Sequence, residues 1–179
     1  MLAYAGIGSR NITLAERQII KRIAKQLSTK FILYSGNAEG SDISFQEGSN
    51  GNCVVMLPYK GFNIKCFDYI KKSKEYFVLK TDEAIESVKK FHPNPSSLNS
   101  WGFDLMVRNY FQINGYEEYE QVSFVVCCAK TKNGKVMGGT GQAVRIALSR
   151  NIPVINIREE GWKEKLRDLY DKFELESTM

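Results

Sequence analysis

Short hydrophobic runs alternate along the chain with segments that carry apolar residues three and four positions apart. The runs, rich in β-branched and aromatic residues, predict strands, and the spaced segments predict amphipathic helices. The predicted strands are residues 2–6, 31–35, 53–57, 76–79, 122–129 and 152–157. This alternation is typical of an α/β, Rossmann-like fold, in which helices cover both faces of a mostly parallel sheet.

Several predicted helices have recognisable ends. Thr13 and Glu16 match a capping box, and the helix that they open ends near Ser28. Thr81 caps another helix, which stops before the prolines in residues 92–95 because proline cannot continue a helix. The remaining predicted helices are residues 41–47, 64–72, 98–114, 140–150 and 162–173.

The predicted helix at residues 98–114 is apolar on nearly all sides. An amphipathic surface helix would have a polar face, so this one is expected to be buried or to form the contact of a homodimer. Arg108 lies within it. A buried guanidinium needs an anionic or polar partner, and a ligand phosphate or an internal acid, either Asp42 or Glu47, would serve.

Three predicted strand-to-helix turns are rich in glycine. They read YAGIGSR at residues 4–10, YSGNAEGSD at residues 34–42 and MGGTGQ at residues 137–142. Glycines let backbone N–H groups come close to an anion, and the helix that follows directs its positive dipole end to the same place. Because the carboxyl ends of parallel strands meet at one edge of the sheet, the turns predict a single phosphate-binding crevice.

The candidate ligand-binding residues come from these turns and from the arginine: Gly8, Ser9, Arg10, Ser35, Gly36, Asp42, Arg108, Gly138, Gly139, Thr140, Gly141 and Gln142. Arg10 would bring positive charge to the crevice. The Thr140 hydroxyl and the neighbouring amides suit phosphate, and Gln142 could reach a base or a sugar. The Asp42 carboxylate suits a ribose hydroxyl, or it stabilises the start of the helix that follows it.

Composition narrows the class of protein. The chain of 179 residues, 43% of them hydrophobic, is expected to form one domain over residues 1–179. It has no apolar stretch long enough for a membrane span and no signal-peptide pattern, so we expect a cytoplasmic protein with no membrane partner. Its four cysteines and one histidine have no metal-ligand spacing, and no metal or cofactor is predicted. The net charge of +5 is modest but suits a phosphate or nucleic-acid partner.

Four segments resemble the SLOG superfamily of Rossmann-like domains: GIGSR at residues 6–10, SGNAEGSDISF at residues 35–45, Arg108-Asn109, and GGTGQAVRIA at residues 138–147. That superfamily includes the Lonely Guy phosphoribohydrolases and the DNA-processing protein DprA. The resemblance spans residues 3–157 and is strongest for small stand-alone DprA-like proteins often carried by bacteriophages.

The resemblance implies three functions. The main expectation is the binding of a nucleotide or nucleotide-derived phosphorylated small molecule. A DprA-like protein would instead bind single-stranded DNA and act as a recombination mediator. A Lonely Guy-like enzyme would cleave the N-glycosidic bond of a nucleoside monophosphate.

The enzyme alternative depends on one position. Lonely Guy enzymes end their Pro-Gly-Gly-x-Gly-Thr-x-x-Glu motif with a catalytic glutamate, where this sequence has Arg145. Glycoside cleavage needs a carboxylate, and an arginine would oppose the developing positive charge. Catalysis is therefore left open, with Arg108 and Asp42 as candidates. Arg145 is either a second cation near a bound phosphate or a solvent-facing residue.

Overall fold

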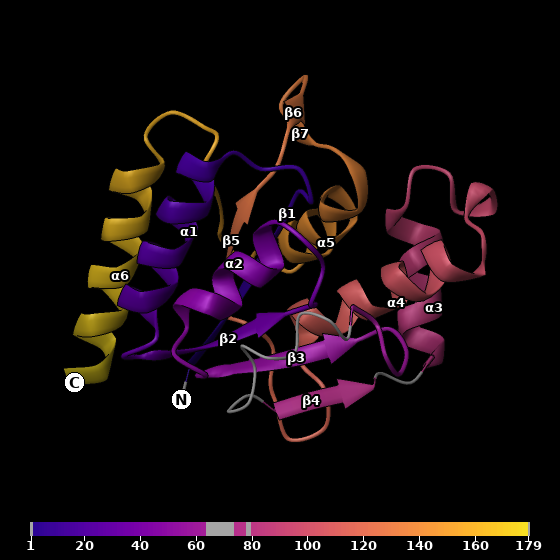
Figure 1. The fold of residues 1–179 in the computed structure, drawn as a ribbon, viewed down its shortest axis with the longest axis horizontal. Coiled ribbons are helices and arrows are strands. Elements are labelled where there is room, and N and C mark those ends of the chain that lie inside the picture. The colour runs from indigo at the N-terminus through magenta and orange to yellow at the C-terminus, as the bar shows by residue number, and fades with distance from the viewer. Residues whose placement is uncertain (1, 64–73, 78–79, 179) are drawn as a thin grey trace.

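A computed structural model describes residues 2–63, 74–77 and 80–178 of the chain and shows a parallel sheet between two layers of helices (Figure 1). The strands of this sheet are β1 (Leu2–Gly8), β2 (Phe31–Ser35), β3 (Cys53–Leu57), β4 (Lys74–Phe77), β5 (Phe124–Cys128) and β8 (Val154–Asn156). Their order is β4-β3-β2-β1-β5-β8, and all neighbours are parallel. The predicted α/β Rossmann-like fold is confirmed.

The helices divide between the two faces of the sheet. They are α1 (Leu14–Leu27), α2 (Ser41–Gly48), α3 (Asp82–Phe91), α4 (Ser100–Asn114), α5 (Gly138–Ser149) and α6 (Trp162–Thr178). Helices α1, α2 and α6 pack on one face, and α3, α4 and α5 pack on the other. Within the described ranges, no helix is long and apolar enough to cross a membrane.

Alternating side chains of the strands fill both core layers. In β1, Tyr4 packs on the α1 side, whereas Ala3 and Ala5 pack on the α4 side. Every residue of β5 is buried, as expected of a central strand covered on both faces. Since β1 pairs with β2 on one side and with β5 on the other, the strand order reverses there. In open α/β sheets this switch point is where ligands bind.

The structure moves several predicted boundaries. Strand β1 continues to Gly8, and α5 begins at Gly138 rather than at residue 140. Residues 131–136, which the predicted strands and helices leave out, form a small antiparallel hairpin of β6 (Thr131–Lys132) and β7 (Lys135–Val136). Its turn residues Asn133 and Gly134 both have positive φ angles, as a type I′ hairpin turn requires.

Two other predicted elements lie partly or wholly outside the residues that the structure describes. The strand expected at residues 76–79 is observed as β4 at residues 74–77, and residues 78–79 lie outside the described part. The helix expected at residues 64–72 also lies outside it.

The apolar helix α4 is buried against its own chain. Met106, Val107, Phe111 and Ile113 are buried in the core layer that α4 shares with α3 and α5. Much of its apolar surface therefore has an internal partner. The homodimer through this helix stays a prediction.

Candidate functional site

A cleft of about 430 Å³ opens at the carboxyl ends of β1 and β5. The loop after β1, the start of α2, the middle of α4, the end of β5 and the start of α5 all contribute to its wall. The lining residues are Ile7, Gly8, Ser9, Arg10, Ala38, Asp42, Leu105, Met106, Arg108, Asn109, Gln112, Ala129, Lys130, Met137, Gly138, Gly139, Thr140 and Ala143. The three glycine-rich turns thus meet at one cleft.

Most of the candidate residues from the sequence line this cleft: Gly8, Ser9, Arg10, Asp42, Arg108, Gly138, Gly139 and Thr140. The other candidates, Ser35, Gly36, Gly141 and Gln142, lie behind its wall. The wall also contains Asn109 and Lys130, which the turn pattern does not single out.

Ser35 and Gly36 lie behind the cleft wall and hold residues that form it. Ser35 is fully buried, and its hydroxyl donates to the Asp42 carbonyl (3.3 Å) and accepts from the Gln46 amide (3.0 Å). The Gly36 carbonyl accepts a hydrogen bond from the Arg108 guanidinium. A Cβ at position 36 would overlap that guanidinium, so a larger residue there would force the buried Arg108 side chain to shift.

Gly141 and Gln142 hold the first turn of α5. The backbone of Gly141 passes so close to the Val136 carbonyl that a Cβ would overlap it. Gln142 is fully buried, and its Oε1 accepts from Asn109 Nδ2 (3.0 Å). Asn109 Nδ2 also donates to the Gly139 carbonyl (3.2 Å). Gln142 therefore orients Asn109, and it is Asn109 that faces the cleft.

Arg108 and Asp42 form a buried pair in the wall. Arg108 Nη1 lies 3.8 Å from Asp42 Oδ2, and both side chains are about 5% exposed. Burial raises the pKa of Asp42 to about 6, against the opposing effects of Arg108 and of hydrogen bonds from the Ala38 and Gly36 amides. Burial likewise lowers the pKa of Arg108, and Asp42 opposes that shift. Of the two internal acids considered for Arg108, Asp42 is the partner, and Glu47 pairs with Lys21 (2.7 Å).

The first turn of α5 has backbone N–H groups without helical acceptors, and its residues line the cleft. Gly141 N–H makes the first helical bond, to Met137 (3.2 Å), which leaves the N–H groups of Gly138, Gly139 and Thr140 without acceptors inside the helix. The side chain of the N-cap residue, Met137, makes no capping hydrogen bond to them. Arg10 and Lys130 add positive charge to the same cleft. Exposed amides at a helix start together with nearby cations favour a bound phosphate.

Arg145 lies outside the cleft lining. Its Nε donates to the Phe91 carbonyl (2.6 Å), so the side chain ties α5 to the end of α3. Arg145 was expected to be either a second cation near a bound phosphate or a solvent-facing residue. The structure instead shows a partly buried side chain on the α3 side of the helix, where it makes this contact.

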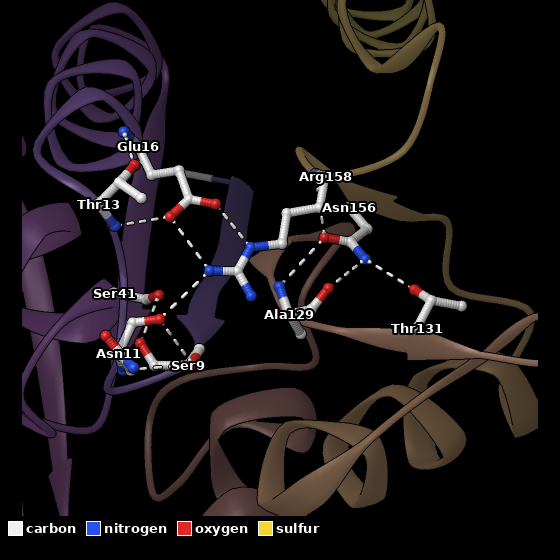
Figure 2. Close-up of polar contacts among 9 residues, drawn as sticks. All are labelled: Ser9, Asn11, Thr13, Glu16, Ser41, Ala129, Thr131, Asn156 and Arg158. Carbon is white, nitrogen blue, oxygen red and sulfur yellow. Dashed lines mark hydrogen bonds and ion pairs between the residues drawn. The ribbon is translucent and has the colours of Figure 1, made fainter.

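A polar network that the sequence did not reveal holds the cleft loops (Figure 2). Arg158 donates two hydrogen bonds to Glu16 (2.6 and 3.1 Å) and one to the Asn11 carbonyl (3.2 Å). Asn156 pairs with the Ala129 backbone, donating to its carbonyl (2.9 Å) and accepting from its N–H (3.1 Å). The end of β8 and the residues after it thereby fix the loops that follow β1 and β5.

The loop after β1 is also held directly. Ser9 N–H donates to the Cys128 carbonyl (2.7 Å). The Ser41 hydroxyl and N–H both donate to the Ser9 carbonyl (2.9 and 3.1 Å). A Cβ at Gly8 would lie 2.6 Å from the Cys128 carbonyl oxygen, so glycine is needed for this close approach. The position of Arg10 is consequently set by β5 and α2.

Because Glu16 and Arg158 are paired, we expect the free energy of unfolding to fall in acid. The hydrogen bond from Arg158 lowers the pKa of Glu16 from 4.5 to about 2. The carboxylate therefore stabilises the fold above pH 4.5, and this contribution is lost as the pH falls toward 2. Glu16→Gln should cost about 1 kcal/mol at pH 7, and its difference from the wild type should shrink at pH 3. Urea unfolding at both pH values measures this, and Arg158→Met should give the same pattern. An unchanged difference at pH 3 would refute the assignment.

Fold and cleft together define an α/β, Rossmann-like protein with a cleft at its topological switch point, lined by glycine-rich turns. Neither a protein-family model nor a curated protein sequence matches the chain. Solved structures of DNA processing protein A are similar in fold. The Helicobacter pylori protein has a TM-score of 0.59 at 20% identity, over 93% of this chain and 72% of that one.

The second solved structure is DNA processing protein A (DprA) from Streptococcus pneumoniae. It has a TM-score of 0.53 at 14% identity, and the match covers 94% of this chain but only 56% of the streptococcal protein. At these identities the likeness establishes a shared fold. SLOG membership and a bacteriophage source stay predictions.

Proposed function

We propose that the chain binds single-stranded DNA, with one nucleotide in the cleft and its phosphate at the start of α5. The observation that carries the proposal is the convergence of three features on one cleft: free helix-start amides, the cations Arg10 and Lys130, and the amide of Asn109. The solved Helicobacter pylori protein of the same fold binds single-stranded DNA. This likeness favours the DNA-binding alternative over a small-molecule ligand.

Each part of the cleft has a distinct task in this proposal. The α5 amides take the phosphate, while Arg10 and Lys130 attract the backbone on either side of it. The side-chain Nδ2 of Asn109 donates its hydrogen bonds to Gln142 and to the Gly139 carbonyl. The Oδ1 of Asn109 has no hydrogen-bond partner among the described residues. That oxygen can accept from a base or a sugar.

A free mononucleotide is the second candidate, because a volume of about 430 Å³ lies in the usual range of small-molecule pockets. We do not propose glycoside hydrolysis. Among the described residues that line the cleft, Asp42 is the one carboxylate, and it is paired with Arg108. The position of the Lonely Guy glutamate is occupied by Arg145, which lies outside the cleft.

Salt dependence of oligonucleotide binding tests the proposal. We expect a labelled dT12 to bind with a log Kd that varies with log salt by about 0.7 for each phosphate neutralised. Arg10→Ala and Lys130→Ala should each weaken binding and reduce that slope by about 0.7. Lys25→Ala, at the far end of α1, is the matched control and should change neither. Fluorescence anisotropy between 50 and 300 mM salt provides the measurement.

Two results would count against the proposal. Equal affinity for duplex DNA would show that binding does not require a flexible single strand. Full competition by a mononucleotide at the same phosphate concentration as the oligonucleotide would favour the second candidate. Thermal shift with mononucleotides separates these cases, since a ligand that binds the folded state raises the melting temperature.

A further inference from the structure

Trp101 is a large apolar side chain that the packing of the fold does not explain. It lies in the first turn of α4 and is 61% exposed. The Asn99 side chain caps this turn by accepting from the Gly102 N–H (2.8 Å), so the indole stands on an ordered helix start. An exposed tryptophan in a fixed position is a candidate contact surface.

Aromatic rings connect Trp101 to the cleft. The Tyr59 ring and the indole form a T-shaped pair with ring centres 5.0 Å apart, and Tyr59 and Phe62 form another at 5.5 Å. The Arg108 guanidinium is 5.9 Å from the centre of the Phe62 ring. The T-shaped contact with Tyr59 supports the indole, while the 61% exposure of Trp101 leaves much of its surface open to solvent.

The helix places Trp101 next to the wall of the cleft. Leu105 lies four residues further along α4, on the same side of the helix, and it lines the cleft. Arg108 follows on the same side. Trp101 is therefore about one helical turn beyond the cleft edge, on the opposite side of Leu105 from Arg108.

We propose that Trp101, supported by Tyr59, is a stacking platform for a nucleobase next to the nucleotide held in the cleft. This inference rests on the proposed function. A lone exposed indole is small for a protein-docking surface, which usually covers several hundred Å². It matches the size and chemistry of one base, and stacking of bases on aromatic side chains tolerates any sequence.

Phosphate contacts and base stacking contribute to the binding affinity in different ways. The affinity that comes from phosphate contacts in the cleft falls as the salt concentration rises. The affinity that comes from stacking on Trp101 requires a base and changes little with salt. An abasic oligonucleotide keeps the phosphates and lacks the base. Comparison of normal and abasic strands therefore isolates the contribution of Trp101.

Tryptophan fluorescence gives a direct test, because Trp101 and Trp162 are the two tryptophans of the chain. In a Trp162→Phe background, dT12 should quench the emission of Trp101 saturably, and an abasic 12-mer should not. Trp101→Ala should raise the Kd for dT12 by about 5- to 150-fold, the equivalent of one stacked base. Its affinity for the abasic strand and its salt slope should stay at the wild-type values, and Trp101→Phe should retain most of the binding.

The outcomes separate the platform from the proposed function. If dT12 binds with the expected salt slope but leaves Trp101 emission unchanged, and Trp101→Ala binds as the wild type does, the platform is refuted and the cleft proposal stands. If neither strand binds, both fail. The melting temperature of Trp101→Ala checks that its fold is intact, which we expect of a substitution at an exposed position.

Discussion

Arg108→Met should lower the free energy of unfolding by about 3–5 kcal/mol, the largest effect expected of a single side chain here. The substitution keeps a long apolar side chain but leaves the Asp42 carboxylate buried without its cation. It also removes the donor to the Gly36 carbonyl. Urea unfolding at pH 7.5 measures the loss.

The loss should depend on pH in a defined direction. Without Arg108, the Ala38 and Gly36 amides and the Arg10 charge oppose the effect of burial less fully, and the folded-state pKa of Asp42 should rise above the present value of about 6. The folded protein then holds a proton that the unfolded chain, with a pKa of 3.8, has released. Stability therefore falls as the pH rises, and the deficit relative to the wild type should shrink between pH 8 and pH 6.

The double variant Asp42→Asn/Arg108→Met is the control for this interpretation. Because it removes both charges of the buried pair, it should be more stable than the sum of the two single losses predicts. Additive losses would show that the two residues are not coupled. A pH-independent deficit in Arg108→Met would show that the Asp42 carboxylate is not its cause.

Local signals explain why much of the fold could be predicted from the sequence. The capping box of Thr13 and Glu16 is present with both hydrogen bonds, and Cys53–Leu57 is a strand with the predicted bounds. In both places the pattern and the buried positions agree. The two-residue strands β6 and β7 are too short for an alternating pattern to emerge, so only their Asn133-Gly134 turn could be recognised.

The cleft was predictable where the backbone itself forms it. Gly8 and Gly138 line the cleft because they lie at the carboxyl end of β1 and at the start of α5, and topology alone brings these points together. Ser35 was a candidate for the same reason, yet its side chain points into the core toward Gln46. Which way a side chain turns at the end of a strand depends on tertiary packing.

Polar contacts between residues far apart in the chain were the main feature of the site that could not be predicted from the sequence. Glu16 is recognisable as a cap, but its second partner, Arg158, comes from the other end of the chain. Asn156 likewise reads as an ordinary strand residue, although it fixes the Ala129 backbone at the cleft. Pairs of this kind have no spacing rule, because the fold and not the local sequence sets their distance.

Gly40→Ala should cost about 2–5 kcal/mol and weaken DNA binding as well. Gly40 has a φ of 81° and a ψ of −111°, so an L side chain there adds at least the strain of about 1–2 kcal/mol that it has in the left-handed helical region. A Cβ there would also lie 2.6 Å from the Ser9 carbonyl oxygen and closer still to that of Arg10. Neither backbone atom can move aside cheaply, so overpacking adds about 1–3 kcal/mol.

Gly161→Ala separates strain from contact. Gly161 has a similar φ of 73°, but a Cβ there would meet nothing within 4 Å. Urea unfolding should therefore show the strain alone, about 1–2 kcal/mol, with dT12 affinity unchanged. In Gly40→Ala the displaced Ser9 loses its bonds from Ser41, and Arg10 moves with it, so affinity should fall. Equal stability losses and equal affinities in the two variants would mean that the contact between Gly40 and the loop after β1 does not hold the cleft in shape.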